Sequence, residues 1–263
     1  MPFALGAMLV AANGLPSWIL LGLIILSMVF ARTAAMSFNR LVDWEIDKRN
    51  PRTEGRHRLL HRNAAVALLL ICSAAFICTT FWINRLCFYL SPVALVIIFF
   101  YSLTKRFTSW SHFFLGLALA AAPVGAWLAI TGSFAWAPLV LAAGVLLWVA
   151  GFDMIYATMD YEFDVKEGLN SMVVRLGVDK SLRIAQLLHW LMLPLFLLFG
   201  WLAGLGAGYA IAMSVVVGML LYEHRCAKRR DTASINQAFF TSNAIVGTAF
   251  VSGIAVDVWL LPM

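Results

Sequence analysis

Residues Asn39 to Arg56 read NRLVDWEIDKRNPRTEGR and follow a run that is almost purely apolar. Within this stretch Asn39, Asp43 and Asp47 lie four residues apart, and several basic residues follow them. Residues four positions apart share one face of a helix. The stretch therefore predicts a long apolar helix that ends in a polar stripe, whose two neighbouring carboxylates repel each other unless a cation joins them.

A second stretch, DMIYATMDYEFD at residues 153–164, repeats this arrangement. Its polar residues have helical spacing, so a continuous helix would place all of them on one face: Asp153, Tyr156, Asp160 and Asp164. Asp153 follows the wholly apolar LLWVAGF, and an ionisable side chain at membrane depth is a functional-site hypothesis by default. A solvated helix end would explain one such stripe alone, but two stripes indicate the two halves of one site.

The composition predicts an integral membrane protein. Of the 263 residues, 62% are hydrophobic and 12% are charged, whereas soluble domains carry about 25% charged residues. Apolar runs of helical length predict an all-α protein with about nine transmembrane helices around a central cavity, in a single domain over residues 1–263. The expected helices lie near 2–12, 17–38, 64–83, 86–103, 112–131, 137–159, 183–203, 205–222 and 239–261. The first is too short to cross a membrane alone.

The distribution of charge predicts the orientation. Most of the 19 Lys and Arg residues lie in the loops after the second, fourth, sixth and eighth expected helices. Lys and Arg mark cytoplasmic loops, so we expect a multi-pass protein of the cell (inner) membrane with these loops in the cytoplasm. The net charge of +6 is then a topology signal, and no nucleic-acid partner is expected. The Asp and Glu residues, except Asp257, lie at the same ends, so we expect the site to face the cytoplasm.

Carboxylates beside clustered basic residues suggest a metal-bound diphosphate. Mg²⁺ typically takes one or two carboxylates and completes its shell with water and substrate phosphate, and Arg or Lys neutralises the remaining charge. The basic candidates are Arg52, Arg56 and Lys105, each of which also has the simpler explanation of a topology-setting charge. Arg32 extends the first stripe, seven residues before Asn39.

The histidines and cysteines point to no second centre. No HxxxH or HExxH pattern occurs, and we expect His112, His189 and His224, at helix ends, to be interfacial side chains. The four cysteines form no CxxC pair, and we expect those in the apolar runs to behave as small buried apolar residues.

The two stretches resemble the signatures of the UbiA-type intramembrane prenyltransferases. NxxxDxxxD corresponds to residues 39–47, and DxxYxxxDxxxD to residues 153–164. The resemblance spans nearly the whole chain, and by comparison with the family we expect the first helix to lack its N-terminal half. The segment ARTAAMSFNRLVDWEIDKRNPRT is most similar to the branch of 4-hydroxybenzoate polyprenyltransferases and related menaquinone-pathway enzymes.

This resemblance implies a mechanism. A polyprenyl diphosphate would enter laterally from the lipid bilayer, ionise to an allylic cation and alkylate an aromatic acceptor in ubiquinone or menaquinone biosynthesis. The expected ligands of Mg²⁺ are Asn39, Asp43, Asp47, Asp160 and Asp164. Arg52, Arg56 and Lys105 would neutralise the leaving diphosphate. Asp153 and Tyr156 lie deeper and would steady the cation or orient the acceptor, and Arg32 would act near the diphosphate or the acceptor's carboxylate.

Two other kinds of function stay open from the sequence. One is prenyl transfer to another acceptor, such as haem, chlorophyllide or a glyceryl lipid. The other is a non-enzymatic membrane carrier of a metal–diphosphate lipid. CDP-alcohol phosphotransferases are disfavoured because their DGxxAR pattern is missing, and soluble prenyl synthases because the chain has no Asp-Asp pair.

Overall fold

The computed structural model describes residues 1–55 and 60–260, and every regular element in those residues is a helix. In chain order they are α1 (Pro2–Ala12), α2 (Trp18–Val42), α3 (Trp44–Arg49), α5 (Arg62–Ile83), α6 (Arg85–Thr104), α7 (Ser111–Thr131), α8 (Trp136–Ala157), the 3₁₀-helix η1 (Thr158–Asp160), α9 (Tyr161–Glu167), α10 (Met172–Leu176), α11 (Val178–Leu202), α12 (Ala207–Ala227) and α13 (Thr232–Trp259). In the described residues, eight helices are long and apolar enough to cross a membrane. The prediction of an all-α, multi-pass membrane protein is confirmed, with α1 as the ninth apolar helix.

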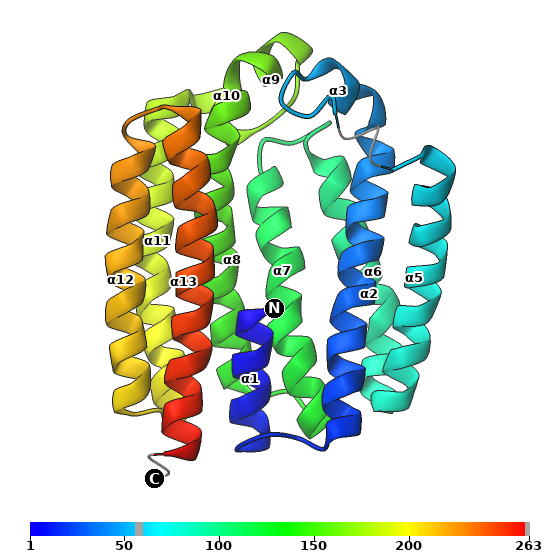
Figure 1. Ribbon diagram of the computed structural model, residues 1–263, viewed down its shortest axis with the longest axis vertical. Helices are drawn as coiled ribbons and strands as arrows, with labels where there is room; N and C mark the ends of the chain where they lie inside the picture. The colour runs from blue at the N-terminus through cyan, green and yellow to red at the C-terminus, as the bar shows by residue number, and fades with distance from the viewer. Residues whose placement is uncertain (56–59, 261–263) are drawn as a thin grey trace.

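The long helices stand side by side in one bundle (Figure 1). Neighbours in the sequence pack against each other, as α7 does against α8 and α12 against α13. Short loops favour this antiparallel packing of consecutive helices. The segments α3 and α9, which carry parts of the two acidic stretches, lie together at one end of the bundle (Figure 1). The fold therefore brings the two stretches to the same end.

Helix α1 fills part of the interior and does not cross the bundle. It is 11 residues long and packs between α7 and α13. The ring of Phe3 lies 4.9 Å from that of Trp148 and 4.8 Å from that of Phe250, measured between centroids. In Figure 1 it occupies the half of the bundle away from α3 and α9. The interior is therefore packed in that half, as expected for a helix too short to span.

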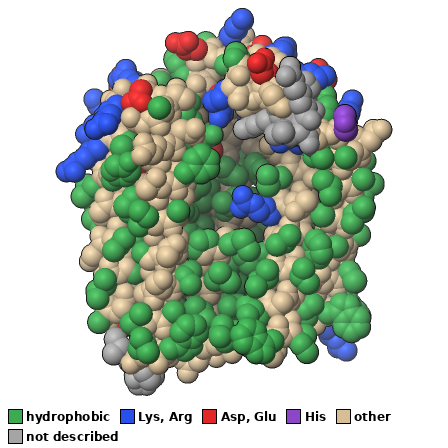
Figure 2. All heavy atoms as spheres, in the orientation of Figure 1, with side chains coloured by type: hydrophobic (Ala, Val, Ile, Leu, Met, Phe, Trp, Pro, Cys, Tyr) green, Lys and Arg blue, Asp and Glu red, His purple; other side chains and the backbone are tan. Residues whose placement is uncertain are grey.

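The outer surface matches a membrane environment. Large apolar side chains are exposed over its whole height, and Figure 2 shows them covering the body of the molecule while charged side chains gather at the α3–α9 end. Exposed tryptophans mark the opposite ends of the long helices: Trp18, Trp82, Trp136, Trp201 and Trp259. Tryptophan is enriched at membrane–water boundaries, so this ring marks the far boundary of the apolar region.

Both acidic stretches interrupt their helices, which the sequence did not predict. Helix α2 ends at Val42, and Asp43 has φ −91° and ψ 6° before α3 begins. The backbone still follows the helical pattern, since the N–H of Asp47 donates to the carbonyl of Asp43 at 2.7 Å. In the second stretch, residues 158–160 form a 3₁₀ turn, where the Thr158 hydroxyl bonds to the Ile155 carbonyl at 2.6 Å. Such a local bond competes with regular helix, so neither stripe lies on one straight helix face.

Candidate active site

The two short segments after the breaks meet over the polar end of the bundle. Arg49 of α3 pairs with Glu167 of α9 at 3.0 Å. The hydroxyl of Thr53 donates to the carbonyl of Asp47 at 3.2 Å, which folds the following turn back onto α3. Because α3 and α9 come from sequence regions over a hundred residues apart, this contact closes the end of the bundle above the interior.

Asp43 lies at the centre of the first half of the site. Its side chain is buried, and its Oδ2 accepts from Lys105 Nζ at 2.6 Å and from Asn39 Nδ2 at 3.2 Å. Burial raises the pKa of Asp43, and the Lys105 ammonium only partly opposes that effect. Within the described residues its other oxygen, Oδ1, is buried without a hydrogen-bond partner. A buried oxygen of this kind is costly, so Asp43 is suited to receive a cation.

Lys105 is held by the loop that follows α9. Gly168 ends α9 with φ 66°, in the left-handed region that glycine adopts without strain. The turn brings the backbone N–H of Asn170 to the carbonyl of Lys105 at 2.8 Å. The second acidic stretch thus anchors the residue that pairs with the first.

Arg52 joins the second half of the site to the turn after α3. Its Nε donates to Asp160 Oδ1 at 2.7 Å, its Nη2 donates to Asp160 Oδ2, and its Nη1 donates to the hydroxyl of Tyr156 at 2.8 Å. Asn50 adds a bond to Asp160 Oδ1 at 3.2 Å. The guanidinium also lies over the Tyr156 ring, 5.0 Å from its centroid. A planar fork on a carboxylate fixes both partners, so Asp160, Tyr156 and Arg52 form one unit.

A cavity of about 180 Å³ connects the two halves below this cap. Its polar walls come from seven different elements or loops: Asn39, Tyr101, Ser102, Lys105, Ser111, His112, Asp153, Asp164, Asn170 and Ser171. Leu115, Ala157 and Leu169 supply apolar walls. Figure 2 shows the outer face hollowed below the charged end, with a basic side chain inside the hollow. The interior near the acidic residues is thus open to one side of the bundle.

The expected residues fall into three groups. Asn39, Lys105, Asp153 and Asp164 line the cavity, and Asp43 bonds to two of these four. Asp160, Tyr156 and Asp47 belong to the cap beside it. Arg32 is exposed on α2 and interacts electrostatically with the cavity residue Tyr101. Arg56 lies outside the described residues.

The expectation that the histidines are interfacial was wrong for His112, His189 and His224, which are all buried. His189 is buried against His224, with 2.9 Å between Nδ1 and Nε2. His112 is buried in the first turn of α7, where its Nδ1 lies 2.6 Å from Asp153 Oδ2. The only sequence signal for His112 was its place soon after Lys105, at the same end of the bundle.

The site residues suit a magnesium ion. Among the described residues no three acidic, histidine or cysteine side chains already stand as a metal cluster. Mg²⁺ does not require one, because it commonly takes one or two carboxylates and the substrate's phosphates. The donors here are carboxylate and amide oxygens, and the unpartnered Asp43 Oδ1 leaves a hard-oxygen ligand available. The residues therefore fit the ion that the motifs implied.

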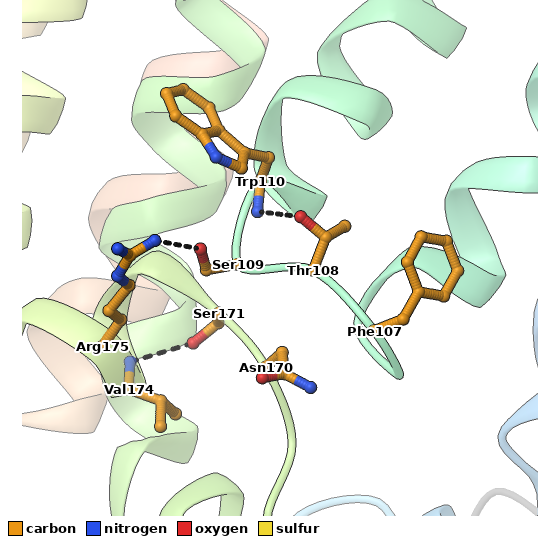
Figure 3. Close-up of a pocket in the computed structure, with 8 residues that line it drawn as sticks. All are labelled: Phe107, Thr108, Ser109, Trp110, Asn170, Ser171, Val174 and Arg175. Carbon is orange, nitrogen blue, oxygen red and sulfur yellow. Dashed lines mark hydrogen bonds between the residues drawn. The ribbon is translucent and has the colours of Figure 1, made fainter.

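A second depression lies beside the site on the same end. It has a volume of about 520 Å³ and is formed by the loop after α6 and the loop before α10. Figure 3 shows Arg175 bonded to Ser109, with 3.4 Å between Nη1 and Oγ, and Asn170 and Ser171 shared with the smaller cavity. None of the acidic motif residues lines it, so the smaller cavity is the candidate active site.

Known proteins match this chain over most of its length. A profile of the UbiA prenyltransferase family matches residues 1–245. The chain is 31% identical over 258 residues to a 4-hydroxybenzoate octaprenyltransferase from Aliivibrio fischeri, with 94% of this chain and 87% of that protein covered. A protein of the same name from Vibrio campbellii is 28% identical over 256 residues, covering 96% of this chain and 89% of that protein.

Solved structures share the fold. The apo structure of a UbiA homologue from Aeropyrum pernix K1 superposes with a TM-score of 0.88 at 28% identity, covering 97% of this chain and 95% of that one. A UbiA homologue from Archaeoglobus fulgidus bound to GPP and Mg²⁺ has a TM-score of 0.70 at 20% identity, covering 97% and 94%. At that identity the second comparison supports the fold alone.

Proposed function

The chain belongs to the UbiA prenyltransferase family and is a multi-pass membrane prenyltransferase, and from that premise we propose its reaction. It transfers a polyprenyl group from polyprenyl diphosphate to a 4-hydroxybenzoate-like aromatic acceptor in quinone biosynthesis, with Mg²⁺ as cofactor. One observation carries the proposal furthest: Asn39, Asp164 and Lys105, from three distant parts of the sequence, line one cavity. The 4-hydroxybenzoate octaprenyltransferases that resemble the chain support the choice of acceptor.

The diphosphate of the donor binds at the capped end. The residues that would hold Mg²⁺ are the polar members of the two motifs: Asn39, Asp43, Asp47, Asp160 and Asp164. When bound, Mg²⁺ supplies positive charge that stabilises the departing diphosphate. Lys105 and Arg52 are the cations nearest these carboxylates, at 2.6 Å from Asp43 and 2.7 Å from Asp160 respectively. They neutralise the diphosphate as its bond to the prenyl carbon breaks, and Arg56 follows Arg52 in the same segment.

The remaining walls serve the prenyl cation and the acceptor. The cation forms when the diphosphate leaves with the bonding electron pair. Leu115, Ala157 and Leu169 present apolar surface that excludes water, which would otherwise capture the cation. Tyr156 lies beside Arg52, which contacts its ring and its hydroxyl. Aromatic faces attract cations, so this ring would stabilise the prenyl cation. Arg32, seven residues before Asn39 on α2, would meet the acceptor's carboxylate or the diphosphate.

We also propose that the site opens toward the cytoplasm. The loops after α2, α6, α9 and α12 lie at the site's end of the bundle and carry most of the basic residues. Excess Lys and Arg in short loops marks the cytoplasmic side. The exposed tryptophans at the other end would then lie at the outer boundary of the membrane.

A transfer assay tests the proposal. Membranes containing the protein are incubated with labelled polyprenyl diphosphate and either 4-hydroxybenzoate, a dihydroxynaphthoate or a glycerol phosphate, in Mg²⁺ or in EDTA. We expect prenylated product with an aromatic acid and only in Mg²⁺. Binding of the diphosphate without turnover of any aromatic acceptor would refute the proposed reaction, and product with the glycerol phosphate alone would assign the other acceptor class.

A further inference from the structure

A buried histidine contacts one carboxylate of the cavity. His112 begins α7 and is 3% exposed, while Asp153 lies on α8 with a side chain that is 28% exposed. The two meet with 2.6 Å between His112 Nδ1 and Asp153 Oδ2. Both residues line the cavity. Asp153 is therefore the accessible member of the pair, and His112 is the buried member that holds it.

The packing of α7 against α8 fixes this pair. Gly116 lies one turn after His112, and a Cβ added to it would lie 2.5 Å from the backbone carbonyl oxygen of Leu146 on α8. Only a residue without a Cβ permits this approach. The close contact draws the start of α7 toward α8, where Asp153 lies two turns further along from Leu146. The distance between His112 and Asp153 is thus set by the backbones of two packed helices.

The second nitrogen of His112 shows that the ring serves Asp153. Among the described residues, Nε2 is buried without a hydrogen-bond partner. In the neutral ring one nitrogen donates and the other accepts, and leaving a donor unpaired costs more than the contact would gain. The arrangement is explained when Nδ1 carries the hydrogen and donates to Asp153, which leaves Nε2 as an unprotonated acceptor.

We propose that His112 is a positioning residue for catalysis: it holds Asp153 in place to accept a proton from the hydroxyl group of a phenolic substrate. The inference rests on the proposed function and adds to it the group that activates the acceptor. A cavity of roughly 150 Å³ accommodates benzene in another protein, so the space of about 180 Å³ beside Asp153 is large enough for one substituted ring.

The proposed step balances as follows. The carbon–oxygen bond of the donor breaks with its electron pair on the diphosphate, and the ring carbon next to the hydroxyl forms a bond to the prenyl carbon. The hydroxyl proton passes to Asp153 as the ring gives up electrons. The ring carbon then loses its hydrogen as a proton to the departing diphosphate, and Asp153 returns its proton to the ring oxygen. His112 stays hydrogen-bonded to Asp153 throughout.

The charges around the pair are compatible with this role. The cavity also presents Lys105 at the end of α6, Asp164 on α9, Tyr101 on α6 and Asn39 on α2. The cationic Lys105 is bonded to Asp43, so it does not neutralise Asp153 directly. Asp153 has His112 as its one partner in the described residues, which leaves its other oxygen for a substrate hydroxyl.

Two substitutions of His112 test the inference in the full-length protein. H112F removes the donor while keeping a buried ring, and H112N places an amide N–H where Nδ1 lies. Turnover and KM for both substrates are measured with 4-hydroxybenzoate and with ring-fluorinated analogues, whose hydroxyl is more acidic. H112L replaces H112F if that variant does not accumulate in the membrane.

We expect H112F to lower kcat about 100-fold, the low end of the contribution of a positioned proton-transfer group, with KM for the donor unchanged. H112N should recover kcat to within about tenfold of the unsubstituted protein. The loss in H112F should shrink with the fluorinated acceptors, because a more acidic hydroxyl needs less help to ionise. D153N should lose activity with every acceptor.

Three results would overturn the inference. Unchanged kcat in H112F would show that Asp153 needs no support, and equal losses in H112F and H112N with all acceptors would show a purely structural role. If the unsubstituted protein prenylates another acceptor class but no phenol, the proposed function fails together with this inference. Turnover of 4-hydroxybenzoate by the unsubstituted protein with either of the first two results refutes this inference alone.

Discussion

Replacing Arg52 with alanine should separate metal binding from diphosphate binding. The guanidinium contacts both oxygens of Asp160 and the hydroxyl of Tyr156. Asp160 is also an expected ligand of Mg²⁺, so the ion and Arg52 compete for the same carboxylate. Without Arg52 the ion alone should bind more tightly. The donor's diphosphate should bind and react less well, because a cation that neutralises its departing charge is gone.

The geometry sets the size of both effects. Two unit charges about 4 Å apart interact by about 4 kcal/mol at the effective dielectric constant near a protein surface. The Arg52 side chain is 28% exposed, and solvent and salt reduce the repulsion felt by the ion to about 1 kcal/mol. That corresponds to an affinity for Mg²⁺ alone that is about fivefold higher. Loss of a preorganised donor to developing negative charge lowers kcat about 100-fold or more.

Calorimetric titration with Mg²⁺, in the presence and absence of a non-reacting prenyl diphosphate analogue, measures the two affinities. R52K is the matched control, since it keeps the positive charge and loses the planar fork. We expect R52K to bind Mg²⁺ alone like the unsubstituted protein and to show intermediate turnover. Weaker binding of Mg²⁺ alone by R52A, or unchanged turnover, would contradict the competition inferred from the contacts.

Further predictions concern the metal motifs and the helix packing. Asp43→Ala and Asp160→Ala should each abolish turnover while the protein still accumulates in the membrane, and retained activity in either would remove that residue from the ion's ligands. Because burial, only partly opposed by Lys105, raises the pKa of Asp43, folding favours its protonated form. The stability of the metal-free protein should therefore fall as the pH rises through that folded-state pKa, and Asp43→Asn should remove the fall; thermal unfolding in EDTA between about pH 4 and pH 8 measures it. Gly116→Ala should lower the free energy of unfolding by about 1–3 kcal/mol, because the added Cβ would lie 2.5 Å from the Leu146 carbonyl oxygen. The measurement is the melting temperature, which should fall. Gly125→Ala on the same helix has no atom of another part of the described structure within 4 Å of its added Cβ and should be neutral or stabilising, so equal effects of the two would refute the packing argument.

The helices were predictable because the bilayer fixes their length. A chain with this many apolar runs of about 20 residues can place them stably only as helices that span the membrane. The start of α13 was predicted near residue 239 but lies at Thr232, where Asp231 caps the helix by accepting from the Ser234 N–H at 2.7 Å. Its first two turns mix polar residues with Ala233, Ile235 and Ala238, so they gave no continuous apolar run. Helix ends outside the membrane depend on such caps, which hydrophobicity does not register.

The sequence predicted the candidate site residues within each motif, but not the contacts between the elements that carry them. Spacing identified Asp43, Asp153 and Asp164, and the structure brings them to one end of the bundle. The breaks at Asp43 and at residues 158–160 were not predicted. The second accompanies the bond from the Thr158 hydroxyl to the Ile155 carbonyl, a local competition with regular helix that residue spacing does not register. The partnership of His112 with Asp153 depends on how closely two helices pack. No periodicity within either helix encodes that distance.

Under the proposed function, the position of helix α1 means that the protein would not select the length of the prenyl tail. Its packed residues, including Phe3 and the fully buried Ala7 and Met8, fill the interior below the cavity, so a long tail has no path down the centre. The hollow below the charged end opens on the lipid side, and a tail that leaves through it would lie among acyl chains. Each further isoprene unit would then gain nothing from the protein, and the length of the product would follow the supply of donor.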